Sequence, residues 1–132
     1  MTIAIFGLGL IGGSMGLDLK AAGHRVLGID HNPAHQKEAL DLQLIDATAG
    51  LEEALAEADL VIIATPVNVM ETLIPQILDR VTERTTITDV GSTKARLARL
   101  IKHHPRRKQF VLSHPMAGTE FSGPQAALKG LF

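Results

Sequence analysis

Short apolar runs alternate with amphipathic or polar segments along the whole chain. The runs at residues 2–6 and 25–29 predict two strands, and residues 10–22 between them predict a helix that ends before Gly23. Strand, helix and second strand follow one another within about thirty residues, which is the size of one βαβ unit. The chain therefore opens with a βαβ unit.

The same alternation continues toward the C-terminus. A continuously apolar run at residues 60–64 is typical of a strand that helices cover on both faces. Strands that alternate with helices through short connections indicate an α/β protein, with a doubly wound, mainly parallel six-stranded sheet of the Rossmann type in the order 3-2-1-4-5-6. The remaining predicted strands lie near Asp46 and at 86–89 and 110–113, and the remaining predicted helices at 33–42, 51–57, 66–81 and 92–103.

Composition and charge fit one domain that binds a small molecule. The 132 residues are 45% hydrophobic and 20% charged, and no repeat or linker divides them, so we expect a single domain over residues 1–132. A net charge of −1 indicates neither a nucleic-acid nor a membrane partner, and no apolar run approaches the ~18 residues that span a bilayer. The lack of cysteine excludes disulfides, and without a leader pattern after Met1 the expected location is cytoplasmic.

The six residues after the first predicted strand, GLGLIG at 7–12, match the GxGxxG pattern of dinucleotide-binding loops. Glycines at positions 12, 13 and 16 fall in the predicted helix, where each costs about 0.5–1 kcal/mol relative to alanine, so we expect another part of the backbone to approach closely there. A glycine-rich turn that only packs tightly is the alternative. The candidate cofactor-binding residues of this loop are Gly7, Leu8, Gly9, Leu10, Ile11 and Gly12.

Asp30 ends the second predicted strand, 23 residues after Gly7. A carboxylate at this point accepts hydrogen bonds from the adenosine ribose and repels the 2′-phosphate of NADP. No arginine follows nearby, although His31, His35 and Lys37 could assist a phosphate. The sequence therefore favours NAD as cofactor, and an ordinary turn residue at Asp30 is the alternative.

Two later strand ends carry candidates for the nicotinamide half of the cofactor. Thr65, Pro66 and Val67 follow the fourth predicted strand, where they either contact the nicotinamide ribose or form an ordinary strand-to-helix turn. Ser92 follows the fifth strand and is expected to cap the next helix. A capping hydroxyl can also hydrogen-bond a ligand or His114.

His114 follows the last predicted strand and precedes Pro115, and it is the candidate for proton transfer beside a bound dinucleotide. A structural or surface histidine is the alternative. Lys94, in the first turn of the predicted helix, opposes the helix dipole, which favours a functional or ion-pair role. The other five histidines show no metal-binding spacing, so no metal site is expected.

Four motifs together resemble the prephenate dehydrogenases and the related arogenate dehydrogenases. They are GLGLIGGS at 7–14, ATPV at 64–67, DVGSTK at 89–94 and HPMAGTE at 114–120. The last is the specific one, because the glycine loop occurs in many dehydrogenases. The resemblance covers essentially the whole chain and implies an oxidoreductase of tyrosine biosynthesis, which converts prephenate to 4-hydroxyphenylpyruvate by NAD-dependent oxidative decarboxylation.

The resemblance also implies roles for individual residues. His114 would accept the proton of the ring hydroxyl of the substrate, which requires a neutral imidazole, while hydride passes to the nicotinamide and the ring carboxylate leaves as carbon dioxide. Ser92 would hydrogen-bond the histidine, the cofactor and the substrate hydroxyl. Thr119 and Glu120 would lie near the substrate entrance.

Members of this family continue into a helical domain that completes a homodimer and supplies an arginine for a substrate carboxylate, and the 132 residues contain no such segment. We therefore expect this chain to be the nucleotide-binding part of a longer enzyme, poorly active by itself. Three alternatives stay open: arogenate as the substrate, a dehydrogenase or reductase of other small molecules on the same scaffold, and a non-catalytic NAD-binding module.

Overall fold

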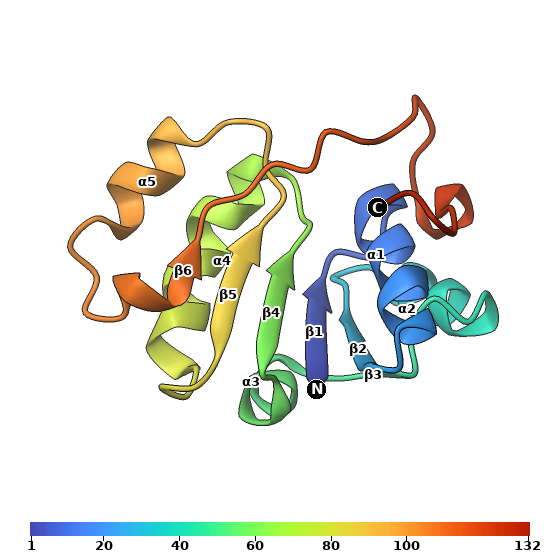
Figure 1. Ribbon diagram of the computed structural model, residues 1–132, viewed down its shortest axis with the longest axis horizontal. Helices are drawn as coiled ribbons and strands as arrows, with labels where there is room; N and C mark the ends of the chain where they lie inside the picture. The colour runs from blue at the N-terminus through green and yellow to red at the C-terminus, as the bar shows by residue number, and fades with distance from the viewer.

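The computed structural model describes residues 1–132 and shows six strands in one sheet with helices on both faces (Figure 1). All five pairs of neighbouring strands are parallel, in the order β3-β2-β1-β4-β5-β6. The predicted fold class and strand order are confirmed. The strands are β1 (Thr2–Phe6), β2 (Arg25–Ile29), β3 (Ala47–Thr48), β4 (Leu60–Ile63), β5 (Thr86–Asp89) and β6 (Phe110–Val111).

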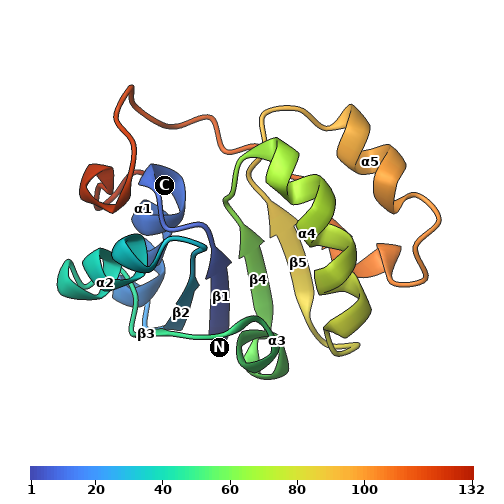
Figure 2. The same ribbon diagram turned by 180° about the vertical axis from the view of Figure 1, so that it is seen from behind.

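The helices connect successive strands and cover the sheet on two sides. Figure 1 shows α1 and α2 on one face, and Figure 2, from behind, shows α3 and α4 on the other. No helix has the length and apolar character needed to cross a membrane. The helices are α1 (Leu10–Ala21), α2 (Pro33–Asp41), α3 (Leu51–Glu57), α4 (Val67–Arg80) and α5 (Ala95–Ile101), with short 3-10 turns η1 (Arg107–Gln109) and η2 (Pro124–Ala126).

Alternate residues of β1 enter two separate hydrophobic cores. Ile3 and Ile5 pack with residues under α1 and α2, whereas Ala4 and Phe6 pack with residues of α3, α4 and α5. Burying an isoleucine or phenylalanine side chain stabilises a fold by about 1.5–3 kcal/mol, so both layers hold the central strand firmly. The sheet is therefore a rigid support for whatever follows the carboxyl ends of its strands.

The helix after β5 begins later than predicted. We expected Ser92 to cap a helix over 92–103, but α5 starts at Ala95, and Lys94 occupies the capping position without a side-chain cap. The preceding backbone is held differently: the buried carboxylate of Asp89 accepts the Gly91 N–H at 2.9 Å and pairs with Lys94. The prediction that Ser92 is a helix cap is wrong, whereas an ion pair of Lys94 is confirmed.

The last strand is shorter than predicted, since β6 ends at Val111 and not at residue 113. Beyond Val111 the N–H of Ser113 donates to the Asp89 side chain at 3.3 Å. A side-chain carboxylate therefore accepts this N–H in place of a backbone carbonyl of β5. The chain then leaves the sheet edge and crosses its top (Figure 1).

We call residues 112–132 the crossing segment. It runs over the carboxyl ends of the strands from β6 to α1, and η2 then packs against α1 and α2. Its end is held on α1, where the Leu128 N–H donates to the buried Ser14 hydroxyl at 2.9 Å and the Gly130 N–H donates to Asp18 at 2.7 Å. The sequence pattern predicted no element beyond residue 113.

Replacing Ser14 by alanine is expected to lower the free energy of unfolding by about 1–2 kcal/mol, because the buried Ser14 hydroxyl loses its hydrogen bond to the Leu10 carbonyl oxygen and the Leu128 N–H loses its partner. Chemical denaturation measures this change, and limited proteolysis should cut the crossing segment faster in the variant. A variant with wild-type stability and wild-type cleavage would contradict the anchoring role.

Candidate nucleotide-binding site

The carboxyl ends of β1, β2, β4 and β5 surround a cavity of about 670 Å³, which the crossing segment closes on one side. Asp30 lines one end of it and His114 another, and the glycine loop after β1 lies between them. Open α/β sheets bind their ligands at this edge, where the strand order reverses beside β1. The cavity is therefore the candidate site.

The glycine loop is shaped by contacts that leave no room for a side chain. Gly7 has φ +93°, and a Cβ there would lie 2.6 Å from the carbonyl oxygen of Ala64. A Cβ at Gly12 would lie 1.9 Å from the Gly7 carbonyl oxygen, and one at Gly16 would lie 2.3 Å from that of Leu44. The close backbone approach expected from the helical glycines is confirmed at Gly12 and Gly16, whereas at Gly13 the side chains of Ala127 and Leu44 are the close neighbours.

Gly9 differs from these glycines, because a Cβ there would meet nothing within 4 Å. Gly9 lines the cavity, so packing within the protein does not explain why this position lacks a side chain. Space for a ligand close to the backbone does explain it, as in loops that cradle a pyrophosphate.

The N-terminus of α1 opens on the same space. Leu10 and Ile11 of its first turn line the cavity, and this turn carries no acidic residue. The first backbone N–H groups of a helix have no partner within it and bear partial positive charge, so they bind anions such as phosphate. No lysine or arginine lines the cavity, so these N–H groups are its main source of positive potential.

Asp30 is held at the far end of the cavity by backbone donors. One carboxylate oxygen accepts the Leu8 N–H and the other accepts the Asn32 N–H, each at 2.9 Å. Its side chain is only 6% exposed, and the Nδ1 atoms of His31 and His35 lie 3.3 and 3.7 Å from it. A fixed carboxylate here can accept hydrogen bonds from ribose hydroxyls.

A smaller, mainly apolar cavity of about 340 Å³ adjoins the first beside Asp30. Gly7, Asp30, His31 and Thr65 line both cavities. The apolar walls of the smaller one suit a flat heterocycle attached to a ribose that Asp30 holds. Its apolar lining consists of Phe6, Ile29, Leu51, Val69 and Leu73.

Thr65 carries an unsatisfied polar atom. Its hydroxyl oxygen is buried and has no hydrogen-bond partner in the protein. Buried polar atoms in proteins are nearly always hydrogen-bonded, so an unpaired one beside a cavity points to a ligand. Thr65, with the open position at Gly9 and the carboxylate of Asp30, fits a dinucleotide such as NAD.

Ser92 and His114 both line the cavity, and they come from the loops after β5 and β6. Ser92 and His114 are both exposed, and no hydrogen bond joins the two residues. Both side chains are therefore available to a bound molecule. No cluster of three or more potential metal ligands is present.

Of the other candidate residues from sequence, some line the cavity and some do not. Pro66 and Val67 line the cavity beside Thr65. Leu8 is a buried core residue and Gly12 packs against Gly7, so neither lines the cavity and both shape the loop from behind. Thr119 and Glu120 are exposed and lie outside the cavity lining.

Several lining residues were not among the candidates from sequence. The crossing segment contributes five of them, two from within the HPMAGTE motif and three from the residues after it. Its path over the sheet brings all five to the cavity. They are Pro115, Ala117, Phe121, Ser122 and Gly123.

Comparison with known proteins matches this chain to one family. The family model for the nucleotide-binding domain of prephenate dehydrogenase matches residues 15–132. Prephenate dehydrogenase of Bacillus subtilis is 41% identical over 99% of this chain, which spans 37% of that relative.

Solved structures extend the likeness to the fold. A structure of prephenate dehydrogenase from Aquifex aeolicus with hydroxyphenyl propionate and NAD+ superimposes with a TM-score of 0.88 and 31% identity over 99% of this chain. Arogenate dehydrogenase of Synechocystis superimposes with a TM-score of 0.85 and 28% identity over the whole chain. The chain spans 47% of each of those two proteins, which is less than half of their length.

Proposed function

Because this chain belongs to the prephenate dehydrogenase family, of which it carries the nucleotide-binding domain, we propose that it binds NAD and serves the oxidative decarboxylation of prephenate to 4-hydroxyphenylpyruvate. The observation that carries this proposal is the single cavity with Asp30 at one end, the glycine loop in the middle, and Ser92 with His114 at another end. A dinucleotide needs these contacts in this order.

Each part of the cavity has a role in binding. The Asp30 carboxylate accepts the ribose hydroxyls, the smaller apolar cavity takes the adenine, and the N–H groups of the α1 N-terminus receive the pyrophosphate. Thr65 supplies a hydroxyl between the two cavities. In this arrangement Ser92 and His114 would be the residues that face the nicotinamide.

Bound NAD supplies the acceptor for the hydride that leaves the substrate. The neutral imidazole of His114 accepts the proton of the ring hydroxyl as the carbonyl forms, and the ring carboxylate departs as carbon dioxide. Ser92 holds the same hydroxyl by a hydrogen bond. Aromatisation of the ring drives the step to completion.

Prephenate is a dicarboxylate, yet no lysine or arginine lines the cavity. Bidentate arginine is the usual clamp for a carboxylate, and loss of substrate orientation costs several kcal/mol of transition-state stabilisation. Residues 1–132 by themselves are therefore expected to bind NAD and to turn prephenate over slowly. The complete protein, which we propose to be a homodimer, brings the missing cation.

Arogenate is the second candidate substrate, favoured by the likeness to the Synechocystis enzyme. The test is an assay of the complete protein with NAD and either prephenate or arogenate, following NADH emission and the aromatic product. Turnover of either substrate supports this family of reactions. Turnover of simple hydroxy acids alone would overturn it in favour of another dehydrogenase.

Substituting Asp30 by asparagine is expected to weaken NAD binding about tenfold and to narrow the preference for NAD over NADP, because the amide no longer repels a 2′-phosphate. Titration with NADH and NADPH, followed by their emission, measures both affinities. Asp46→Asn is the matched control, since Asp46 accepts the Val26 N–H at 2.8 Å at the opposite end of β2. If the ratio of the NADH and NADPH affinities is unchanged in Asp30→Asn, Asp30 does not determine the preference for NAD over NADP.

A further inference from the structure

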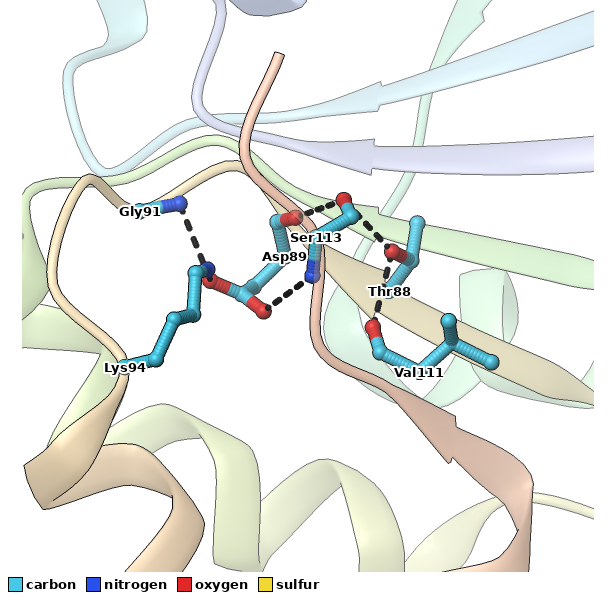
Figure 3. Close-up of polar contacts among 6 residues, drawn as sticks. All are labelled: Thr88, Asp89, Gly91, Lys94, Val111 and Ser113. Carbon is cyan, nitrogen blue, oxygen red and sulfur yellow. Dashed lines mark hydrogen bonds and ion pairs between the residues drawn. The ribbon is translucent and has the colours of Figure 1, made fainter.

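The loops that carry Ser92 and His114 are tied together behind the cavity by a polar network (Figure 3). Its central member is Asp89, the last residue of β5, whose side chain is fully buried. Lys94 reaches it from the start of α5, and Ser113 reaches it from the residue directly before His114. None of these three side chains lines the cavity.

The Asp89 carboxylate joins two loops through its two oxygens. One oxygen accepts the Gly91 N–H at 2.9 Å and forms the ion pair with the Lys94 ammonium. The other accepts the Ser113 N–H at 3.3 Å. Gly91 directly precedes Ser92, and Ser113 directly precedes His114, so one carboxylate holds the neighbour of each residue.

The Ser113 hydroxyl adds a second tie between the same strands. It donates to the backbone carbonyl oxygen of Asp89 and lies 3.0 Å from the Thr88 hydroxyl, which in turn lies 2.9 Å from the carbonyl oxygen of Val111 (Figure 3). These contacts begin where the sheet ends, since β6 pairs with β5 only through Phe110 and Val111.

Ser92 and His114 have no comparable support of their own. No side-chain hydrogen bond holds either residue, and Ser92 does not cap α5. The positions of both side chains therefore depend on the backbone on which they stand. That backbone depends on Asp89, and Asp89 in turn needs Lys94, because a buried carboxylate without a cation is strongly destabilising.

We propose that Asp89, Lys94 and Ser113 are positioning residues, which set the distance between Ser92 and His114 for the proton transfer from substrate. The expected effect on turnover rests on the proposed function. The expected effect on the placement of Ser92 and His114 does not, because it concerns only the structure of residues 1–132. Lys94 acts through Asp89 and does not touch substrate or cofactor. A misplacement of about 1 Å between groups that transfer a proton lowers turnover up to about 100-fold.

The geometric part is tested by NMR on residues 1–132 without any ligand. Lys94→Met is expected to shift the ring signals of His114 and the amide signal of Ser92 together. Lys20→Met is the matched control, since Lys20 forms a partly buried ion pair with Asp46 at 3.3 Å, remote from the cavity, and it should leave both signals in place. If Lys94→Met folds and the signals of His114 and Ser92 do not move, the proposal is overturned, however stable the variant is.

Ser113→Ala serves where Lys94→Met folds poorly, because it keeps the buried ion pair and removes only the hydroxyl tie. It is expected to move the same two signals by a smaller amount, and unmoved signals in this variant too would overturn the proposal.

The catalytic part is tested in the complete enzyme. Lys94→Met is expected to lower kcat about 10- to 100-fold with the NAD dissociation constant within about twofold, and Lys94→Arg should recover most of the loss. Shifted NMR signals with wild-type kcat would overturn the positioning role. If the enzyme turns over neither prephenate nor arogenate, the proposed function has failed, and the NMR result still decides the geometry.

Discussion

His114→Asn in the complete enzyme is expected to lower turnover of prephenate by about 10²–10⁴-fold, while the NAD dissociation constant stays within about twofold. Asparagine retains a hydrogen-bonding group of similar reach but cannot accept a proton at neutral pH. His114 lines the cavity beside Ser92 and has no partner in the protein, so its loss removes chemistry without disturbing the fold.

Steady-state kinetics combined with NADH titration separates these two effects. His103→Asn is the matched control, because His103 is exposed in the turn after α5 and lies outside the cavity, and it should leave both values unchanged. Equal losses of turnover and of NAD affinity in His114→Asn would show that the histidine serves cofactor binding instead.

The second large effect is expected from Gly9→Ala, which should fold with nearly wild-type stability yet bind NAD about 100-fold more weakly. A methyl group at Gly9 meets nothing within 4 Å in the protein, so it enters only the space assigned to the pyrophosphate. Gly12→Ala makes the opposite comparison, since its methyl group would lie 1.9 Å from the Gly7 carbonyl oxygen. That variant should lose several kcal/mol of stability through overpacking.

Thermal unfolding and NADH titration on both variants distinguish packing from ligand space. If Gly9→Ala binds NAD normally, the pyrophosphate does not approach this glycine. If Gly9→Ala unfolds as readily as Gly12→Ala, the space beside Gly9 is not free for a methyl group, and the expected separation of stability from NAD binding fails.

The hydrophobic pattern predicted the sheet well because its strands are short, apolar and regularly separated. β1, β2 and β5 have the expected bounds, and the apolar run of β4 passes through the middle of the sheet. The GxGxxG spacing then predicted the nucleotide loop, because Gly7 and Gly12 stand where neighbouring backbone leaves no room for a side chain, and Gly9 stands where the cavity needs open space.

Features that depend on distant contacts were not predictable in the same way. Ser92 has the residue type and location of a helix cap, yet the Asp89 carboxylate captures the preceding backbone and delays α5 until Ala95. The crossing segment has no periodic pattern, and its path depends on Ser14 and Asp18 more than one hundred residues earlier in the chain. Only the fold reveals that this segment walls the cavity.

We propose that the larger cavity and the smaller apolar cavity beside it form one site, which holds the whole dinucleotide from the adenine beside Asp30 to the nicotinamide near His114. NMR titration of residues 1–132 with NAD tests it most directly, by following the amide signal of Asp30, that of Gly9 and the ring signals of His114. All three sets of signals are expected to move with one shared dissociation constant. Movement at Asp30 and Gly9 with His114 unmoved at saturation, or no saturable movement at all, would contradict it.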